Sequence, residues 1–209
     1  LIKMEKNVIK PKNIKIGLIG DYNVGKTEIG NCYLGEEFQN DKPLYPAGKD
    51  QLETKFKLKN GEEIKLKIFE VNGTEKFKTI TLKFLKIYKG IILIFDVTNK
   101  KSFDNIYMWM EEIKKNVENP NVILFANKVD IEKSKWEVTI EEAQQLAEKM
   151  QIPLFETSAK TKQGIMEGFS YIVNDSYDKT IVTNNNIIIN NKDMERANNN
   201  SGCMTNKKK

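Results

Sequence analysis

Residues 20–27 read Gly20-Asp21-Tyr22-Asn23-Val24-Gly25-Lys26-Thr27, and this stretch decides the fold. It matches the pattern G-x-x-x-x-G-K-[ST], in which a glycine-rich loop joins a buried strand to a helix. The neighbouring residues supply that context, because the apolar run Ile14–Ile19 precedes the loop and a helix is predicted from near Gly25 to Leu34. A chance match in an ordinary loop is the alternative, and the flanking strand and helix argue against it.

The chemistry of this loop is that of a phosphate site. Successive backbone N–H groups form a concave nest for an anion, and the following helix adds the positive end of its dipole. Lys26 would reach the β- and γ-phosphates, and the Thr27 hydroxyl would ligate Mg²⁺. We therefore predict that Gly20–Thr27, together with the adjoining Glu28, binds a nucleotide.

Composition limits the class of protein. At 209 residues, with 39% hydrophobic and 30% charged residues, the chain fits one soluble α/β domain with a tail. No run approaches the roughly 18 apolar residues of a membrane span. The h-region of a signal peptide is not seen, and a start at Leu1 is expected of a truncated or processed chain. The net charge of +5 is spread widely, so nucleic acid is not an expected partner.

Two residue types narrow the chemistry further. Histidine is absent, which excludes His-ligated metal sites and a histidine general base. Cys32 and Cys203 are the two cysteines, which cannot make a disulfide framework and favour a reducing compartment. We expect Cys32 to pack as a small apolar residue.

Strand patterns recur along the chain. Ile91–Phe95 and Val122–Ala126 are continuous apolar runs, as expected of central parallel strands buried on both faces. Leu52–Leu58 and Ile64–Phe69 alternate apolar and polar residues around Asn60-Gly61, which predicts a hairpin. We expect an α/β fold with a six-stranded, mostly parallel sheet that has one antiparallel strand and helices on both faces.

Helix patterns lie between the strands. Residues 102–117 have helical spacing, with Trp109 expected in the core. Thr139 and Glu142 form a capping box that begins the next helix, and residues 165–177 predict the last one. The domain is expected over residues 13–178, after a flexible lead of residues 1–12. Residues 179–209 form an asparagine- and lysine-rich tail that we expect to be disordered.

Two further motifs follow apolar strands, at the edge where open α/β sheets bind ligands. They are Asn127-Lys128-Val129-Asp130 and Glu156-Thr157-Ser158-Ala159-Lys160. The Asp130 carboxylate can accept both of the adjacent donors on one edge of guanine, a pair that adenine lacks. The stems of Lys128 and Lys160 could sandwich the purine, and the Ala159 amide could meet the guanine carbonyl. Ser158 completes the predicted base site.

With three motifs in this order, the chain resembles a Ras-superfamily small GTPase, closest to the Rab family, over residues 13–177. This resemblance implies the P-loop NTPase fold and a switch that binds GTP or GDP with Mg²⁺ in vesicle and membrane traffic. It implies effector and exchange-factor partners at the switch loops. The wording that carries it is Phe77-Lys78-Thr79-Ile80-Thr81, Phe95-Asp96-Val97-Thr98, Ser102-Phe103 and Ile152-Pro153-Leu154-Phe155.

The switch regions depart from that family. Between Glu28 and Glu53 there is no Ser or Thr, and Ala47 or its neighbour stands where the family has its Mg²⁺-binding threonine. The segment that is normally D-T-A-G-Q reads Glu70-Val71-Asn72-Gly73-Thr74. Glu70 keeps a metal-binding carboxylate, and Gly73 keeps a backbone N–H for the γ-phosphate. Thr74 replaces the glutamine that orients the attacking water, so we expect slow hydrolysis and weakened Mg²⁺ coordination.

The tail also departs from the family, which ends in prenylated cysteines. Six residues follow Cys203, and the last three are lysines, which fits neither a C-a-a-X box nor a cysteine pair. An unmodified polar tail is favoured over weak attachment to an anionic leaflet through Cys203 and the lysines. The intermediate expectation is a cytoplasmic monomer with weak, transient membrane contact through this tail, peripheral on endomembranes.

Three functions remain open from the sequence. The first is a Rab-like GTPase switch with slow turnover. The second is a scaffold that holds GTP permanently and does not cycle, which the missing switch residues favour. The third is a P-loop enzyme acting on another phosphate substrate, which the guanine motifs disfavour.

Overall fold

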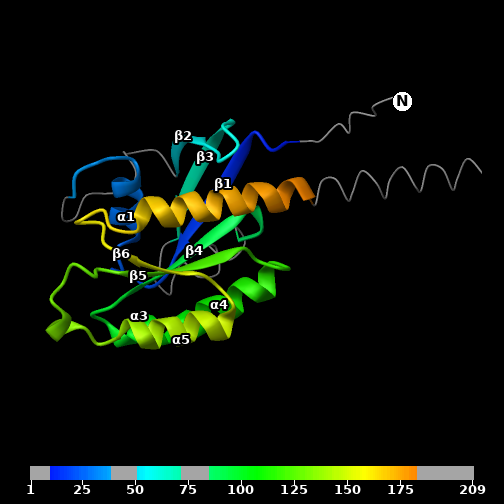
Figure 1. Ribbon diagram of the computed structural model, residues 1–209. Helices are drawn as coiled ribbons and strands as arrows, with labels where there is room; N and C mark the ends of the chain where they lie inside the picture. Colours follow the sequence, from blue (N-terminus) through cyan, green and yellow to red (C-terminus); the bar gives the residue numbers. More distant parts are fainter. Residues whose placement is uncertain (1–9, 39–50, 72–84, 183–209) are drawn as a thin grey trace, which may run out of the picture.

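A single six-stranded sheet forms the centre of the computed structural model, which describes residues 10–38, 51–71 and 85–182 (Figure 1). The strand order is β2-β3-β1-β4-β5-β6. All neighbouring strands are parallel except β2 and β3. The strands are β1 (Asn13–Ile19), β2 (Leu52–Lys57), β3 (Glu63–Glu70), β4 (Gly90–Asp96), β5 (Val122–Asn127) and β6 (Leu154–Thr157). The predicted sheet, including its one antiparallel strand, is confirmed.

Helices cover both faces of the sheet (Figure 1). On one face lie α1 (Lys26–Tyr33) and a helix over residues 165–182. On the other lie α3 (Lys100–Asp104), α4 (Ile106–Asn116) and α5 (Ile140–Met150). Short 3₁₀ turns, η2 (Leu85–Ile87) and η3 (Lys133–Lys135), lie in the connections. None of the helices in these described ranges is long and apolar enough to cross a membrane.

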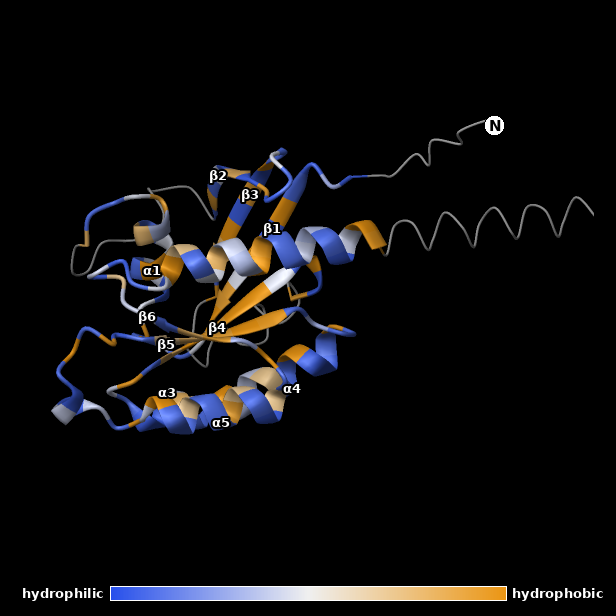
Figure 2. Ribbon diagram, in the orientation of Figure 1, coloured by the Kyte–Doolittle hydropathy of each residue, from blue (hydrophilic) through white to orange (hydrophobic). Residues whose placement is uncertain are grey.

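Each face of the sheet has its own hydrophobic core, because successive strand residues point to opposite faces. Ile92 and Ile94 of β4 pack with Ile29 of α1 and Phe169 of the last helix. Leu93 and Phe95, the alternate residues, pack under α4 and α5. Figure 2 shows the result on the central strand, where β4 is largely apolar along its length, as strands buried on both faces must be.

The predicted helix over residues 102–117 is divided in two. It begins earlier, at Lys100, because the Asn99 side chain caps it by accepting the Ser102 N–H. Asn105 separates α3 from α4, although its own backbone stays in the right-handed helical region (φ −71°, ψ −11°). The capping box of Thr139 and Glu142 on α5 is present as predicted.

The β2–β3 hairpin is bonded to the last helix. Gly61 takes the positive φ (85°) that its turn requires. The Lys59 N–H donates to Asn174 Oδ1 (2.9 Å), and the Tyr177 hydroxyl donates to Glu62 Oε2 (2.6 Å). Burial and this bond to Glu62 raise the pKa of Tyr177 to about 12. The helix continues to residue 182, beyond the predicted domain end at residue 178; the remainder of the predicted tail, residues 183–209, lies outside the described residues.

Candidate functional site: a phosphate loop joined to two base-recognition motifs

The loop between β1 and α1 has a shape that only glycine permits at two points. Gly20 has φ +153°, and a Cβ there would lie 2.2 Å from the Ile94 carbonyl oxygen. Gly25 has φ +95°, and a Cβ there would lie 2.5 Å from Asn127 Nδ2. Because neither position admits a side chain, the backbone can fold tightly against the ends of β4 and β5 and present its N–H groups.

Lys26 is buried beneath this loop, with 4% of its surface exposed. Its ammonium donates to the carbonyls of Gly20 (3.1 Å) and Asp21 (2.6 Å). Burial lowers the pKa of Lys26, while the negative charges of Glu70 and Asp21 partly offset that effect. A lysine ammonium has three donors, and the loop carbonyls take two. A buried cation satisfied mainly by neutral carbonyls suits an anionic ligand, so the loop fits the phosphates it was predicted to hold.

Thr27 and Glu70, the two predicted metal ligands, are in contact. The Thr27 hydroxyl donates to Glu70 Oε2 at 2.8 Å. Burial raises the pKa of Glu70, and the bond from Thr27 and the charge of Lys26 act against that rise. Hydroxyl and carboxylate oxygens are the hard donors that Mg²⁺ prefers, so this pair fits the ion, with phosphate oxygens and water as the further ligands expected for it.

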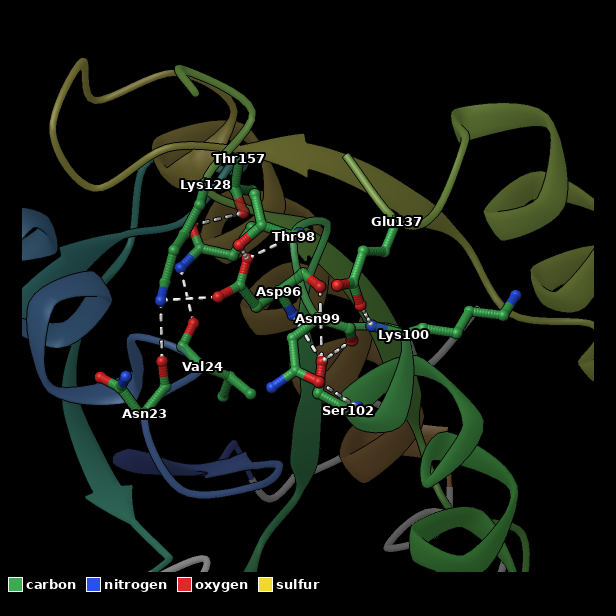
Figure 3. A network of polar contacts seen from close by, with 11 residues as sticks. Asn23, Val24, Asp96, Thr98, Asn99, Lys100, Ser102, Lys128, Glu137 and Thr157 are labelled. Carbon is green, nitrogen blue, oxygen red and sulfur yellow. Dashed lines mark hydrogen bonds and ion pairs between the residues drawn. The ribbon is translucent and has the colours of Figure 1, made fainter. Parts of the chain in front are cut away.

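Two residues of the second motif are bonded directly to the phosphate loop. The buried Asn127 side chain donates to the Val24 carbonyl (2.8 Å), and its Oδ1 accepts from the Thr157 hydroxyl at 3.3 Å. Lys128 Nζ donates to the Asn23 carbonyl at 2.9 Å. All three predicted motifs therefore meet at the carboxyl edge of the sheet, as Figure 3 shows for the contacts around Lys128.

Asp96 is a member of this cluster that the sequence motifs did not predict. One of its carboxylate oxygens pairs with Lys128 Nζ at 2.7 Å, and the other accepts from the N–H (2.9 Å) and hydroxyl (2.8 Å) of Thr98 (Figure 3). Asp96 is 6% exposed, so the ion pair is largely shielded from water. A polar residue at the end of the apolar run over residues 91–95 was the signal that could have found it.

The residues predicted to recognise the base are arranged around Asp130. The Ser158 hydroxyl is buried and donates to Asp130 Oδ1 at 2.6 Å, while Ser158 Oγ accepts from the Thr161 N–H at 3.1 Å. This bond fixes the direction of an otherwise exposed carboxylate. Ala159 is buried beside it and Lys160 is exposed. Asp130 is therefore exposed to solvent, while the buried Ser158 hydroxyl holds its carboxylate in one orientation.

Of the remaining predicted site residues, some lie within the described ranges and others lie outside them. Tyr22 is 74% exposed at the crest of the loop, and Glu28 lies in the first turn of α1. Gly73, Thr74 and Ala47 lie outside the described residues. Asp21 is in the loop as predicted, but its side chain turns to α4, where Asn105 and Trp109 bind it. Helical spacing placed Trp109 in the core and gave no signal for its polar contact.

Comparison with known proteins agrees with this geometry. The Ras family profile matches residues 15–178. The chain is 39% identical to Ras-related protein Rab-13 of Rattus norvegicus over 171 residues, 79% of this chain and 81% of the relative. It is 37% identical to Ras-related protein RABE1e of Arabidopsis thaliana over 167 residues, covering 78% and 74%.

A fungal relative adds to these. GTP-binding protein ypt2 of Schizosaccharomyces pombe is 37% identical over 161 residues, covering 75% of this chain and 77% of the relative. The family profile covers β1 from residue 15, the other five strands, the phosphate loop and both predicted base motifs. The chain therefore belongs to the Ras family and is a Rab-like small GTPase.

Proposed function

We propose that this protein binds guanine nucleotide along the carboxyl edge of the sheet and acts as a slowly hydrolysing switch in vesicle and membrane traffic. The phosphates would lie against Gly20–Lys26 and the base against Asn127, Asp130 and Ser158. The observation that carries this proposal is the pair of bonds from Asn127 to Val24 and from Lys128 to Asn23. They join the phosphate and base elements through the protein's own bonds, and a site that is held in shape in this way has a lower entropy cost of binding.

Base selection rests on Asp130. Its carboxylate can accept two donors, which matches guanine, whereas an amide offers one acceptor and one donor. Asp130→Asn should therefore lose affinity for GDP and gain affinity for xanthosine diphosphate, whose base presents a carbonyl where guanine has an amino group. Competition of both diphosphates against a fluorescent nucleotide measures this. Equal loss of both ligands would show that Asp130 does not read the base.

Slow hydrolysis is proposed from the switch residues. Thr74 is too short to hold the attacking water as glutamine does, and no Ser or Thr between Glu28 and Glu53 can replace the missing threonine. Coordination of Mg²⁺ would then rest mainly on Thr27 and Glu70. Thr74→Gln should raise single-turnover GTP hydrolysis, measured by phosphate release. A wild-type rate equal to that of an ordinary Rab protein would refute the proposal.

A scaffold that holds GTP without cycling is the second candidate, favoured by the same missing threonine and glutamine of the switch regions. The nucleotide released on denaturing freshly purified protein distinguishes the two. GDP supports the cycling switch, GTP supports the scaffold, and an adenine nucleotide or none contradicts both.

The proposed setting follows from the family. Effectors and exchange factors would bind a monomer at the switch loops, without nucleic acid. The protein would be cytoplasmic and peripheral on endomembranes, with weak contact through the lysine tail.

A further inference from the structure

Asp21 holds the phosphate loop to a helix that belongs to none of the nucleotide motifs. Its two carboxylate oxygens accept separate donors: Asn105 Nδ2, from the residue that caps α4, at 2.6 Å and Trp109 Nε1, from α4 itself, at 2.8 Å. The two donors are four residues apart, so they lie one above the other on the same side of the helix. A carboxylate bound at both oxygens has little freedom to rotate.

The same residue contacts the phosphate-binding lysine through its backbone. Lys26 Nζ donates to the Asp21 carbonyl at 2.6 Å. Asp21 thus connects α4, on one face of the sheet, with a loop whose helix α1 lies on the other face (Figure 1). Asn23 and Val24 fix the loop at a second place, through Lys128 and Asn127. The loop is therefore held at both ends of its turn.

Burial makes the contact from Trp109 effective. Its ring is 2% exposed and packs in the core under α4, so its N–H direction is set by the core rather than by solvent. Bonds to a charged acceptor are about twice as strong as neutral ones. The negative charge of Asp21 also acts on Lys26, since it offsets part of the effect of burial on the pKa of that ammonium.

We propose that Trp109 and Asn105 are positioning residues for nucleotide binding: they hold Asp21, and through it they fix the phosphate loop in the shape that retains phosphates. This inference rests on the proposed nucleotide binding. If either donor is removed, the phosphate loop can adopt other conformations when no nucleotide is bound. Nucleotide binding must then order the loop, and this entropy cost lowers the affinity. Neither Trp109 nor Asn105 is proposed to contact the nucleotide; both act through Asp21.

A matched pair of variants tests the inference. Trp136 also donates its indole N–H, to the Ile131 carbonyl at 2.8 Å, away from the phosphate loop. Trp109→Phe should release fluorescent GDP about ten- to a hundredfold faster than wild type, as expected for one lost bond to a charged group. Trp136→Phe should release it at the wild-type rate. Amide exchange in residues 20–25 of nucleotide-free protein should be faster in Trp109→Phe alone.

A double variant separates positioning from packing, because Trp109→Phe also shrinks a buried ring. In an Asp21→Ala background, Trp109→Phe should still lower the unfolding midpoint but no longer change the GDP release rate. Two results would overturn the inference: GDP release from Trp109→Phe that is no faster than from Trp136→Phe, or the same acceleration by Trp109→Phe with and without the Asp21 side chain. If wild type still binds GDP in that case, the proposed function stands. Failure of wild type to bind any guanine nucleotide overturns both.

Discussion

The contact between Gly25 and Asn127 makes a quantitative prediction about two substitutions. A Cβ on residue 25 would meet two atoms within 4 Å, and both belong to Asn127: Nδ2 at 2.5 Å and the amide carbon at 3.8 Å. Gly25→Ala must therefore displace the Asn127 side chain. The displaced amide would lose its bonds to Val24 and Thr157. Because Asn127 is only 2% exposed, water cannot replace those bonds.

The cost follows from these contacts. Asn127→Ala loses two hydrogen bonds and leaves the Val24 carbonyl unsatisfied, about 2–4 kcal/mol in all. Gly25→Ala adds the left-handed conformation, about 1–2 kcal/mol, and so costs about 3–6 kcal/mol. In the double variant the clash is gone, and the second substitution should add only the conformational cost. The double variant should also lose about 3–6 kcal/mol, well short of the additive sum of about 5–10 kcal/mol.

Urea unfolding of nucleotide-free protein, followed by circular dichroism, measures the four free energies without a contribution from ligand affinity. Gly35→Ala is the control, because Gly35 has φ +85° with no atom within 4 Å of its Cβ position. It should cost the same about 1–2 kcal/mol as Gly25→Ala in the Asn127→Ala background. Additivity of the two substitutions would falsify the argument, since the clash would then not be the cause.

Three other predictions concern single residues. Because burial raises the pKa of Glu70, its carboxylate costs stability once ionised, so Glu70→Gln should be more stable than wild type at pH 7 in metal-free buffer. That difference should shrink as pH falls from the raised pKa of folded Glu70 to below the ordinary value of 4.5, where the glutamate is neutral in both the folded and the unfolded state; a difference independent of pH contradicts the assignment. Thr139→Ala removes the bond to the Glu142 N–H and should lower the free energy of unfolding by about 1 kcal/mol; no loss in urea unfolding would mean that the cap adds nothing. Gly168→Ala places a Cβ 2.4 Å from the buried Phe125 ring and should cost about 1–3 kcal/mol by overpacking, seen as a lower thermal midpoint; an unchanged midpoint would show that the ring can move freely.

Much of the fold could be predicted because its signals are local. The apolar runs over residues 91–95 and 122–126 became β4 and β5, since no other element buries both faces of so short a stretch. Asn60-Gly61 and the Thr139 capping box were read correctly because each depends on residues within one turn.

The site was predictable in its motifs but not in its connections. Asp130 and Ser158 were placed together because both follow neighbouring parallel strands. Asp96 and Trp109 were not assigned to the site. Helical period says that a residue is buried, but the acceptor reached by a buried indole N–H depends on how α4 crosses the phosphate loop. That crossing is set by tertiary packing and leaves no mark in the local sequence.

The bonds between the phosphate loop and the base motif also bear on the order of folding. Val24 and Asn127 are 103 residues apart in the chain, and Asn23 and Lys128 are 105 apart. Such contacts close long loops, which costs chain entropy, so we expect them to form late in folding, after β1, β4 and β5 have paired. A partly folded chain then has no complete pocket to offer. We expect a bound nucleotide to act on the native state alone, slowing unfolding while leaving the rate of refolding unchanged.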